Sequence, residues 1–103
     1  MKEITQDERS QFTERYKEKS ANGTLVTKTD YKKDGQTVTD EILGYGFDAV
    51  EIFTKGVDNG ADKIFVEFGA HDDGKICLVL SLMKDGFVVT SYEWSEPCPP
   101  YCG

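Results

Sequence analysis

The feature that most constrains this fold is a series of three strand-like segments joined by two Asp-Gly turns. The segments are residues 63–69, 75–82 and 87–94, and the turns are Asp72-Asp73-Gly74 and Lys84-Asp85-Gly86. Asp-Gly pairs readily adopt the positive φ angles that a two-residue hairpin turn requires. Two such turns in succession predict a three-stranded antiparallel meander.

The middle segment of this meander is apolar on both of its sides. Residues 76, 78, 80 and 82 share one face, and Cys77 and Val79 share the other. A strand of this kind is typical of a sheet that is covered on both faces. We expect the second helix of the chain to cover the first face, and the first helix or the C-terminal tail to cover the other. Cys77 is predicted to be a small buried core residue.

The first helix is predicted from a capping box. In Thr5-Gln6-Asp7-Glu8, the threonine and glutamate are spaced to bond each other's backbone amides. This pattern predicts a helix from about Gln6 to Ser20 that stops at Asn22-Gly23. Phe12 and Tyr16, one turn apart, give it a narrow apolar seam.

A second helix is predicted to begin at Asp48, a favourable N-cap with Glu51 three residues later. Phe47 before the cap is placed to pack against Ile52 as a hydrophobic staple. We expect Val50, Ile52 and Phe53 to point toward the core and Gly56 to end the helix.

An exposed hairpin is predicted between the two helices. Side chains alternate from Thr24 to Tyr31 and again from Gln36 to Ile42, and Asp34-Gly35 can close the turn. Threonine and charged residues dominate both strands, so the hairpin is a candidate sheet edge. The following Gly44-Tyr45-Gly46 is predicted to be a flexible joint.

These segments predict an α+β fold with the order α-β-β-α-β-β-β, in which two helices pack on an antiparallel sheet of about five strands. The chain has 103 residues, which is the size of one domain. We expect residues 1–103 to form a single domain, with residues 95–103 as a Cys/Pro-rich tail.

The charge of the chain bears on its partners. The net charge is −7, and residues 46–103 carry four basic and ten acidic side chains. An acidic surface repels phosphate groups, so we expect neither nucleic acid nor a membrane surface as a partner, whereas a protein partner is compatible. The sequence contains no signal peptide or transmembrane run, which predicts a cytoplasmic protein by default while leaving export and oligomeric state open.

The candidate functional residues lie in the tail. Cys98 and Cys102 flank Pro99, Pro100 and Tyr101. Two thiols at this spacing can close a small disulfide, and the prolines lower the entropy that is lost on closure because they restrict the open chain. Cys98 and Cys102 are therefore the predicted thiol pair, and Pro99, Pro100 and Tyr101 are the predicted tail contacts.

Several uses of the tail are compatible with its sequence. It can be a structural clip that fastens the C-terminus, a redox segment that serves a partner, or the modifiable end of a precursor. It is similar to the Cys-Pro-Tyr-Cys site of glutaredoxins, but it has one more proline and no helix follows it. Because a helix N-terminus is what lowers the thiol pKa in such sites, a thiol-disulfide enzyme is the weakest of these hypotheses.

Other residues give little indication of catalysis, and we expect neither a cofactor nor a metal site. His71 is the single histidine and lies beside Asp72 and Asp73 in a turn, where a solvated position is expected. Residues 58–62 suggest a calcium loop but lack the spacing and terminal glutamate of an EF-hand. Motifs of nucleophilic catalysis and phosphate loops are not present.

From Phe47 onward the chain resembles a group of small uncharacterised bacterial proteins. The shared layout is a short helix that begins at an aromatic residue, strands such as residues 61–68 and 76–80, an Asp-Gly-Lys turn and a terminal Cys-Pro-Pro-Tyr-Cys. The specific element is the segment from Cys98 to Cys102. The resemblance implies a shared architecture and a purposeful tail, and it transfers no catalytic residues.

Taken together, these patterns predict a non-enzymatic interaction module that presents an acidic surface and the Cys-Pro-Pro-Tyr-Cys tail to a protein. The alternative hypothesis is a precursor or substrate protein whose Cys-rich C-terminus is modified by a tailoring enzyme or a redox partner.

Overall fold

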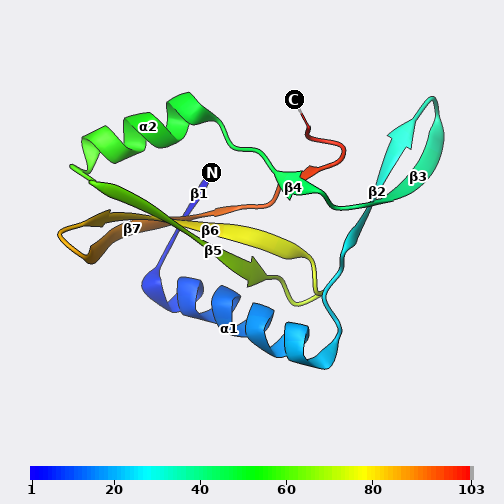
Figure 1. Cartoon of the computed structure of the whole chain (residues 1–103), viewed down its shortest axis with the longest axis horizontal. Helices are drawn as coiled ribbons and strands as arrows, with labels where there is room; N and C mark the ends of the chain where they lie inside the picture. Colours follow the sequence, from blue (N-terminus) through cyan, green and yellow to red (C-terminus); the bar gives the residue numbers. More distant parts are fainter. Residues whose placement is uncertain (103) are drawn as a thin grey trace.

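The computed structural model describes residues 1–102 and confirms an α+β fold with two helices and antiparallel sheets (Figure 1). The helices are α1 (Gln6–Asn22) and α2 (Ala49–Asp58). The strands are β1 (Lys2–Ile4), β2 (Lys28–Lys33), β3 (Gln36–Glu41), β4 (Gly44–Tyr45), β5 (Lys63–Ala70), β6 (Ile76–Lys84), β7 (Phe87–Trp94) and β8 (Pro97–Cys98). Within residues 1–102, no helix combines the length and apolarity needed to cross a membrane.

The main sheet has four strands in the order β1-β7-β6-β5, so the predicted meander forms three of its strands. The fourth, β1, was not predicted, because three residues ahead of a helix cap are too short to show a strand pattern. β1 runs antiparallel to β7, with Ile4 opposite Ser91. Ile4 is buried there, and the pairing brings the N-terminus across the sheet.

Strand β6 is buried on both faces, as its sequence predicts. Its Leu78, Leu80 and Leu82 pack with Tyr92 of β7 and Ile52 of α2 in one apolar cluster. On the opposite face, Cys77 and Val79 are fully buried. Figure 1 shows α1 and α2 on opposite sides of the sheet, so each face of β6 has a helical cover.

Helix α1 follows its predicted caps. The Thr5 hydroxyl accepts from the Glu8 amide at 3.1 Å, the Glu8 carboxylate accepts from the Thr5 amide at 3.0 Å, and Gly23 ends the helix with φ of 67°. The helix approaches β5 closely at Gly69. A Cβ atom at Gly69 would lie 2.9 Å from the Phe12 Cβ and 3.0 Å from the Cys77 Sγ, so a larger residue would push the helix away from the sheet.

Helix α2 begins as predicted but differs in its end and its inward face. The Asp48 carboxylate accepts from the Glu51 amide at 3.0 Å, and the helix continues through Gly56 to Asp58. Ile52 is its one buried residue, whereas the predicted core residues Val50 and Phe53 are 75% and 71% exposed. Because Ile52 and Gly56 are one turn apart, they share the inward face, and the larger side chains fall outside it.

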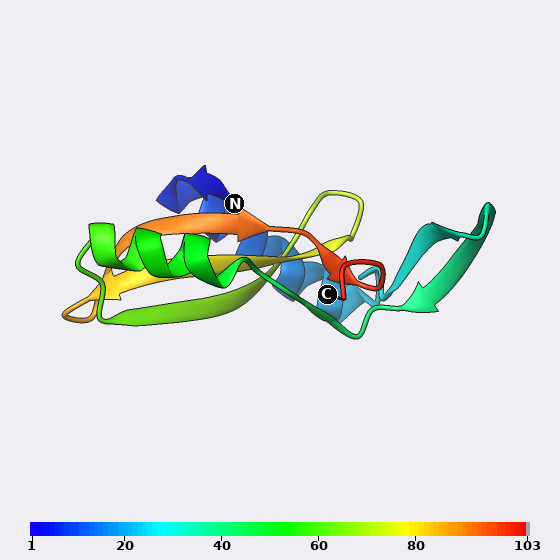
Figure 2. The same ribbon diagram turned by 90° about the horizontal axis from the view of Figure 1, so that it is seen from above.

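The predicted hairpin forms a separate two-stranded sheet, β2–β3, that projects from the body of the molecule (Figures 1 and 2). Asp34 and Gly35 close its turn with φ of 53° and 79°. The first strand begins at Lys28, later than the predicted Thr24, because Val26 instead bridges to Lys75 beside β6. Gly44 and Tyr45, predicted to be a flexible joint, form β4 and pair with β8.

Burial of β6 is expected to dominate the stability of the fold. Leu80→Ala removes a side chain that is 0% exposed, and we predict a loss of about 2–5 kcal/mol in the free energy of unfolding. Leu43→Ala makes the same chemical change where the side chain is 81% exposed, and it should change stability by less than about 0.5 kcal/mol. Urea denaturation of both variants measures this, and equal effects would contradict the assignment of the core.

Candidate functional site

The C-terminal tail folds back onto the body of the protein. Its strand β8 runs antiparallel to β4, with Gly44 opposite Cys98 and Tyr45 opposite Pro97. The Leu43 amide donates to the Cys98 carbonyl at 2.7 Å. The tail is therefore held by backbone hydrogen bonds to a segment that precedes α2.

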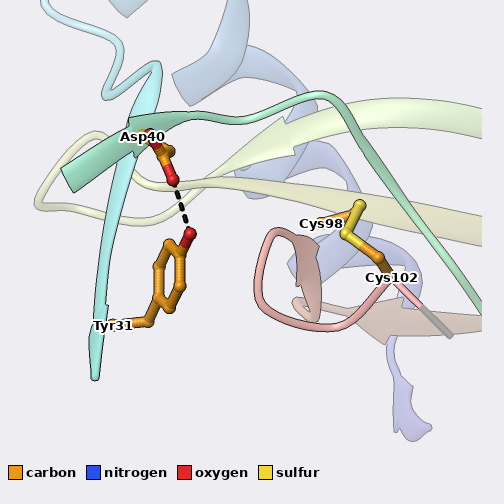
Figure 3. Close-up of a disulfide and its surroundings, with 4 residues drawn as sticks. All are labelled: Tyr31, Asp40, Cys98 and Cys102. Atoms are coloured by element: carbon orange, nitrogen blue, oxygen red, sulfur yellow. Dashed lines mark hydrogen bonds between the residues drawn. A yellow bond between two sulfur atoms is a disulfide. The ribbon is translucent and has the colours of Figure 1, made fainter. Parts of the chain in front are cut away.

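The two tail cysteines are joined in a disulfide (Figure 3). The Cα atoms of Cys98 and Cys102 are 4.7 Å apart, and the Tyr101 amide donates to the Pro97 carbonyl at 3.0 Å across the base of the loop. Cys98 ends a strand and does not begin a helix. A helix dipole that could lower the pKa of this thiol is therefore missing from the described part of the tail.

Two aromatic side chains fasten β4, and with it the tail, to the main sheet. The Tyr45 hydroxyl donates to the Ile76 carbonyl at 2.8 Å, and the Trp94 indole donates to the Gly46 carbonyl. Burial raises the pKa of Tyr45 to about 12, with a smaller contribution from the nearby Cys77 thiol. The Tyr45 hydroxyl thus stays a hydrogen-bond donor over the whole physiological range of pH.

The closed loop of residues 98–102 lies between two open hollows, and Tyr101 borders both of them. One hollow is lined by Leu43, Phe47 and Trp94. The other is shared with the projecting hairpin, where Tyr31 donates to Asp40 across the strands (Figure 3). That hydrogen bond raises the pKa of the half-buried Tyr31. Tyr101 itself is exposed, so the loop offers an aromatic side chain to solvent.

A second candidate surface, which we name the α2–β5 surface, is apolar and exposed. It consists of large side chains on the outer face of α2 and on one face of β5: Val50, Phe53, Val57, Ile64, Val66 and Phe68. Phe65 is exposed on the opposite face of β5. Phe53, Val57 and Ile64 line one groove between the helix and the strand. Contiguous apolar patches on a small protein mark sites of interaction.

The α2–β5 surface also includes a free strand edge. β5 is the last strand of the main sheet, so the backbone groups on its outer side have no strand partner within residues 1–102. The strand carries one positive and one negative side chain, Lys63 and Glu67, and Glu67 accepts from Arg9 of α1 at 2.7 Å. Alternation in the sequence predicted the shared face of Ile64, Val66 and Phe68, but it could not show that α2 leaves this face open.

No family model matches this chain, and the search found no similar curated protein or solved structure. The resemblance of residues from Phe47 onward to small bacterial proteins therefore stays a prediction. The roles of Cys98 and Cys102, and of Pro99, Pro100 and Tyr101 between them, are argued from their geometry.

The disulfide is expected to act as a clip. Closing a loop of about five residues restricts the unfolded chain by roughly 2 kcal/mol, which corresponds to several degrees in melting temperature. Cys98→Ser should therefore lower the melting temperature of the unreduced protein, and an unchanged value would contradict a structural role.

Reduction supplies the control for this variant. A reducing agent should destabilise the wild-type protein by the same amount and leave Cys98→Ser unaffected, because that variant has no disulfide to lose. The intact mass of the wild-type protein should rise by two hydrogens on reduction. Any other mass difference would indicate a modified tail.

Proposed function

We propose that this protein is a non-enzymatic interaction module that pairs with a second copy of itself through β5 and presents its closed loop to a protein partner. The observation that carries the proposal is the combination on β5 of a free backbone edge with exposed apolar side chains. Either property alone is common in small domains. Together they describe a surface that loses both unpaired backbone groups and apolar exposure when another strand binds.

The edge at β5 lacks several of the usual protections against pairing, although it carries Lys63 and although Tyr16 of α1 stacks on Phe68. Natural sheets block their edges with short strands, prolines, bulges or inward-pointing charges. β5 has eight residues and no proline, and the irregularity of the main sheet lies elsewhere, between Leu82 and Met83 where β6 pairs with β7. The opposite edge, β1, has only three residues. Pairing is therefore favoured at β5 and not at β1.

The sequence of β5 is complementary to itself. A two-fold axis through Phe65 would place Lys63 opposite Glu67 of the second copy, and Ile64 opposite Val66. Two Lys63–Glu67 pairs, in which each Glu67 would be shared with Arg9 of its own copy, and two apolar pairs would then flank a central pair of phenylalanines. Each favourable cross-strand pair of this kind contributes about 0.2–1 kcal/mol. An isologous contact of this type closes on itself, so it would give a dimer and not a fibre.

The distribution of charge favours a second copy of the chain as the partner of β5. The whole chain has a net charge of −7, so most contacts between two copies would be repulsive. β5 is an exception, because its one lysine and one glutamate cancel. A dimer formed there would join two four-stranded sheets into one of eight strands and would cover the exposed side of Ile64 and Val66.

The closed loop is the second part of the proposed function. It is bound to β4, outside the main sheet, so pairing at β5 would leave it open in both copies (Figure 2). The disulfide fixes its shape before a partner arrives, which reduces the entropy lost on binding. Because both thiols are held in that bond, the geometry supports a binding role over the alternative of a precursor that awaits modification.

Charge exchange on β5 tests the pairing. Lys63→Glu would place two glutamates opposite each other twice in the dimer. We predict that the dissociation constant of the dimer rises roughly tenfold or more. Adding Glu67→Lys to this variant should restore part of the affinity; because this change also removes the ion pair with Arg9, circular dichroism checks that the double variant is folded. Sedimentation equilibrium at several concentrations measures both effects.

Lys55→Glu is the matched control, since it makes the same change of charge on the exposed side of α2. It should leave the dimer affinity close to that of the wild type. A wild-type chain that stays monomeric at all concentrations, or a Lys55→Glu variant that dissociates as readily as Lys63→Glu, would overturn the self-pairing.

A further inference from the structure

Three side chains from different parts of the chain meet at one end of the main sheet. His71 follows β5, Cys77 lies in β6 and Glu93 lies in β7, and one donor atom from each lies within 4.8 Å of the others. The strand register brings them together, because Cys77 pairs with Gly69 and Val79 pairs with Glu93. The turn between β5 and β6 places His71 at the same end of the main sheet as Cys77 and Glu93.

The acidic group of this cluster accepts a hydrogen bond from the Ser95 hydroxyl and has His71 as its basic neighbour. Cys77 is fully buried and is the one free thiol within residues 1–102. The Glu93 side chain is only 13% exposed, and among the same residues its basic ion-pair partner is His71 alone, at 3.2 Å. A half-buried carboxylate without a lysine or arginine is costly unless another cation balances it.

The orientation of His71 is fixed from two directions. Its Nε2 atom lies 3.1 Å from the Ser95 hydroxyl as well as 3.2 Å from Glu93. The edge of the ring contacts Phe12 of α1, with ring centroids 5.3 Å apart. The imidazole therefore points its Nε2 atom toward Glu93 and Ser95, although 37% of the side chain is exposed.

We propose that His71, Cys77 and Glu93 bind one Zn²⁺ ion, with a water held by Ser95 in the fourth position. Zinc takes nitrogen, sulfur and carboxylate ligands in tetrahedral geometry with bonds of about 2.0–2.3 Å, which puts neighbouring ligand atoms about 3.3–3.6 Å apart. The His71 and Glu93 atoms already have this separation, at 3.2 Å. The Cys77 Sγ lies within 4.8 Å of both atoms and completes the set by moving toward the ion, and its proton leaves to solvent as the Zn–S bond forms.

The donor set also decides against other metals. Mg²⁺ and Ca²⁺ prefer sites made of oxygen atoms, whereas a thiolate with an imidazole selects zinc among the abundant divalent ions. The tail cannot supply these ligands, because Cys98 and Cys102 are joined and Cys77 is the one free thiol in the described chain. His71, predicted from sequence to be a solvated turn residue, keeps 37% of its side chain exposed in the structure, so the proposed ion would lie at the border of the protein and solvent.

Metal titration of the full chain with its disulfide intact tests the proposal. We expect one Zn²⁺ per chain in competition with a chromophoric chelator. Co²⁺ in place of zinc should give a thiolate-to-cobalt charge-transfer absorption and the visible bands of a tetrahedral ion. His71→Asn, Glu93→Gln and Cys77→Ala should each weaken zinc binding roughly tenfold or more, and Cys77→Ala should abolish the charge-transfer band.

Two control variants separate this site from adventitious binding. Asp72→Asn alters a neighbouring exposed acid, and the pair Cys98→Ser and Cys102→Ser removes the tail sulfurs; both should bind zinc as the wild type does. No binding, a cobalt spectrum without the thiolate band, or unchanged zinc affinity in Glu93→Gln would overturn the proposal. If circular dichroism shows that Cys77→Ala does not fold, the wild-type cobalt spectrum and Glu93→Gln decide the question.

Discussion

The fold depends on the burial of β6 between two layers. This strand is apolar on both sides, so neither face of the sheet can be left to water at its centre. The cluster around Leu80 draws in α2 through Ile52, and the face of Cys77 and Val79 requires α1 despite the few apolar residues of that helix. β4 and the tail are also connected to this strand, through the hydrogen bond from the Tyr45 hydroxyl to the Ile76 carbonyl.

Patterns of short range were sufficient to predict most of this architecture. Asp-Gly turns, capping residues and strand alternation are local, and they correctly placed the meander, the hairpin and the start of both helices. Contacts between distant segments were not predictable in this way. β1 and the pairing of β4 with β8 are two or three residues long, and their partners lie far away in the sequence. The inward face of α2 was predicted correctly for Ile52 and wrongly for Val50 and Phe53, which do not reach the sheet.

In the candidate site too, local features were predictable from sequence, whereas contacts between distant segments were not. The spacing of Cys98 and Cys102 allowed a disulfide among several uses of the tail, and the structure joins the two residues. The α2–β5 surface and the cluster of His71, Cys77 and Glu93 were not predicted, since both arise only when separate strands come into register. In each case the fold leaves something incomplete: apolar side chains and backbone groups without cover at β5, and a half-buried carboxylate without a fixed cation at Glu93. These are the places where we expect another molecule or ion to bind.

The central claim is that β5 pairs with its own copy. Hydrogen–deuterium exchange of the backbone amides in residues 63–70, followed by mass spectrometry above and below the dissociation concentration, tests it most directly. Our account predicts that protection of this strand increases with protein concentration while exchange in the β2–β3 hairpin stays constant. Exchange in β5 that does not depend on concentration would contradict it.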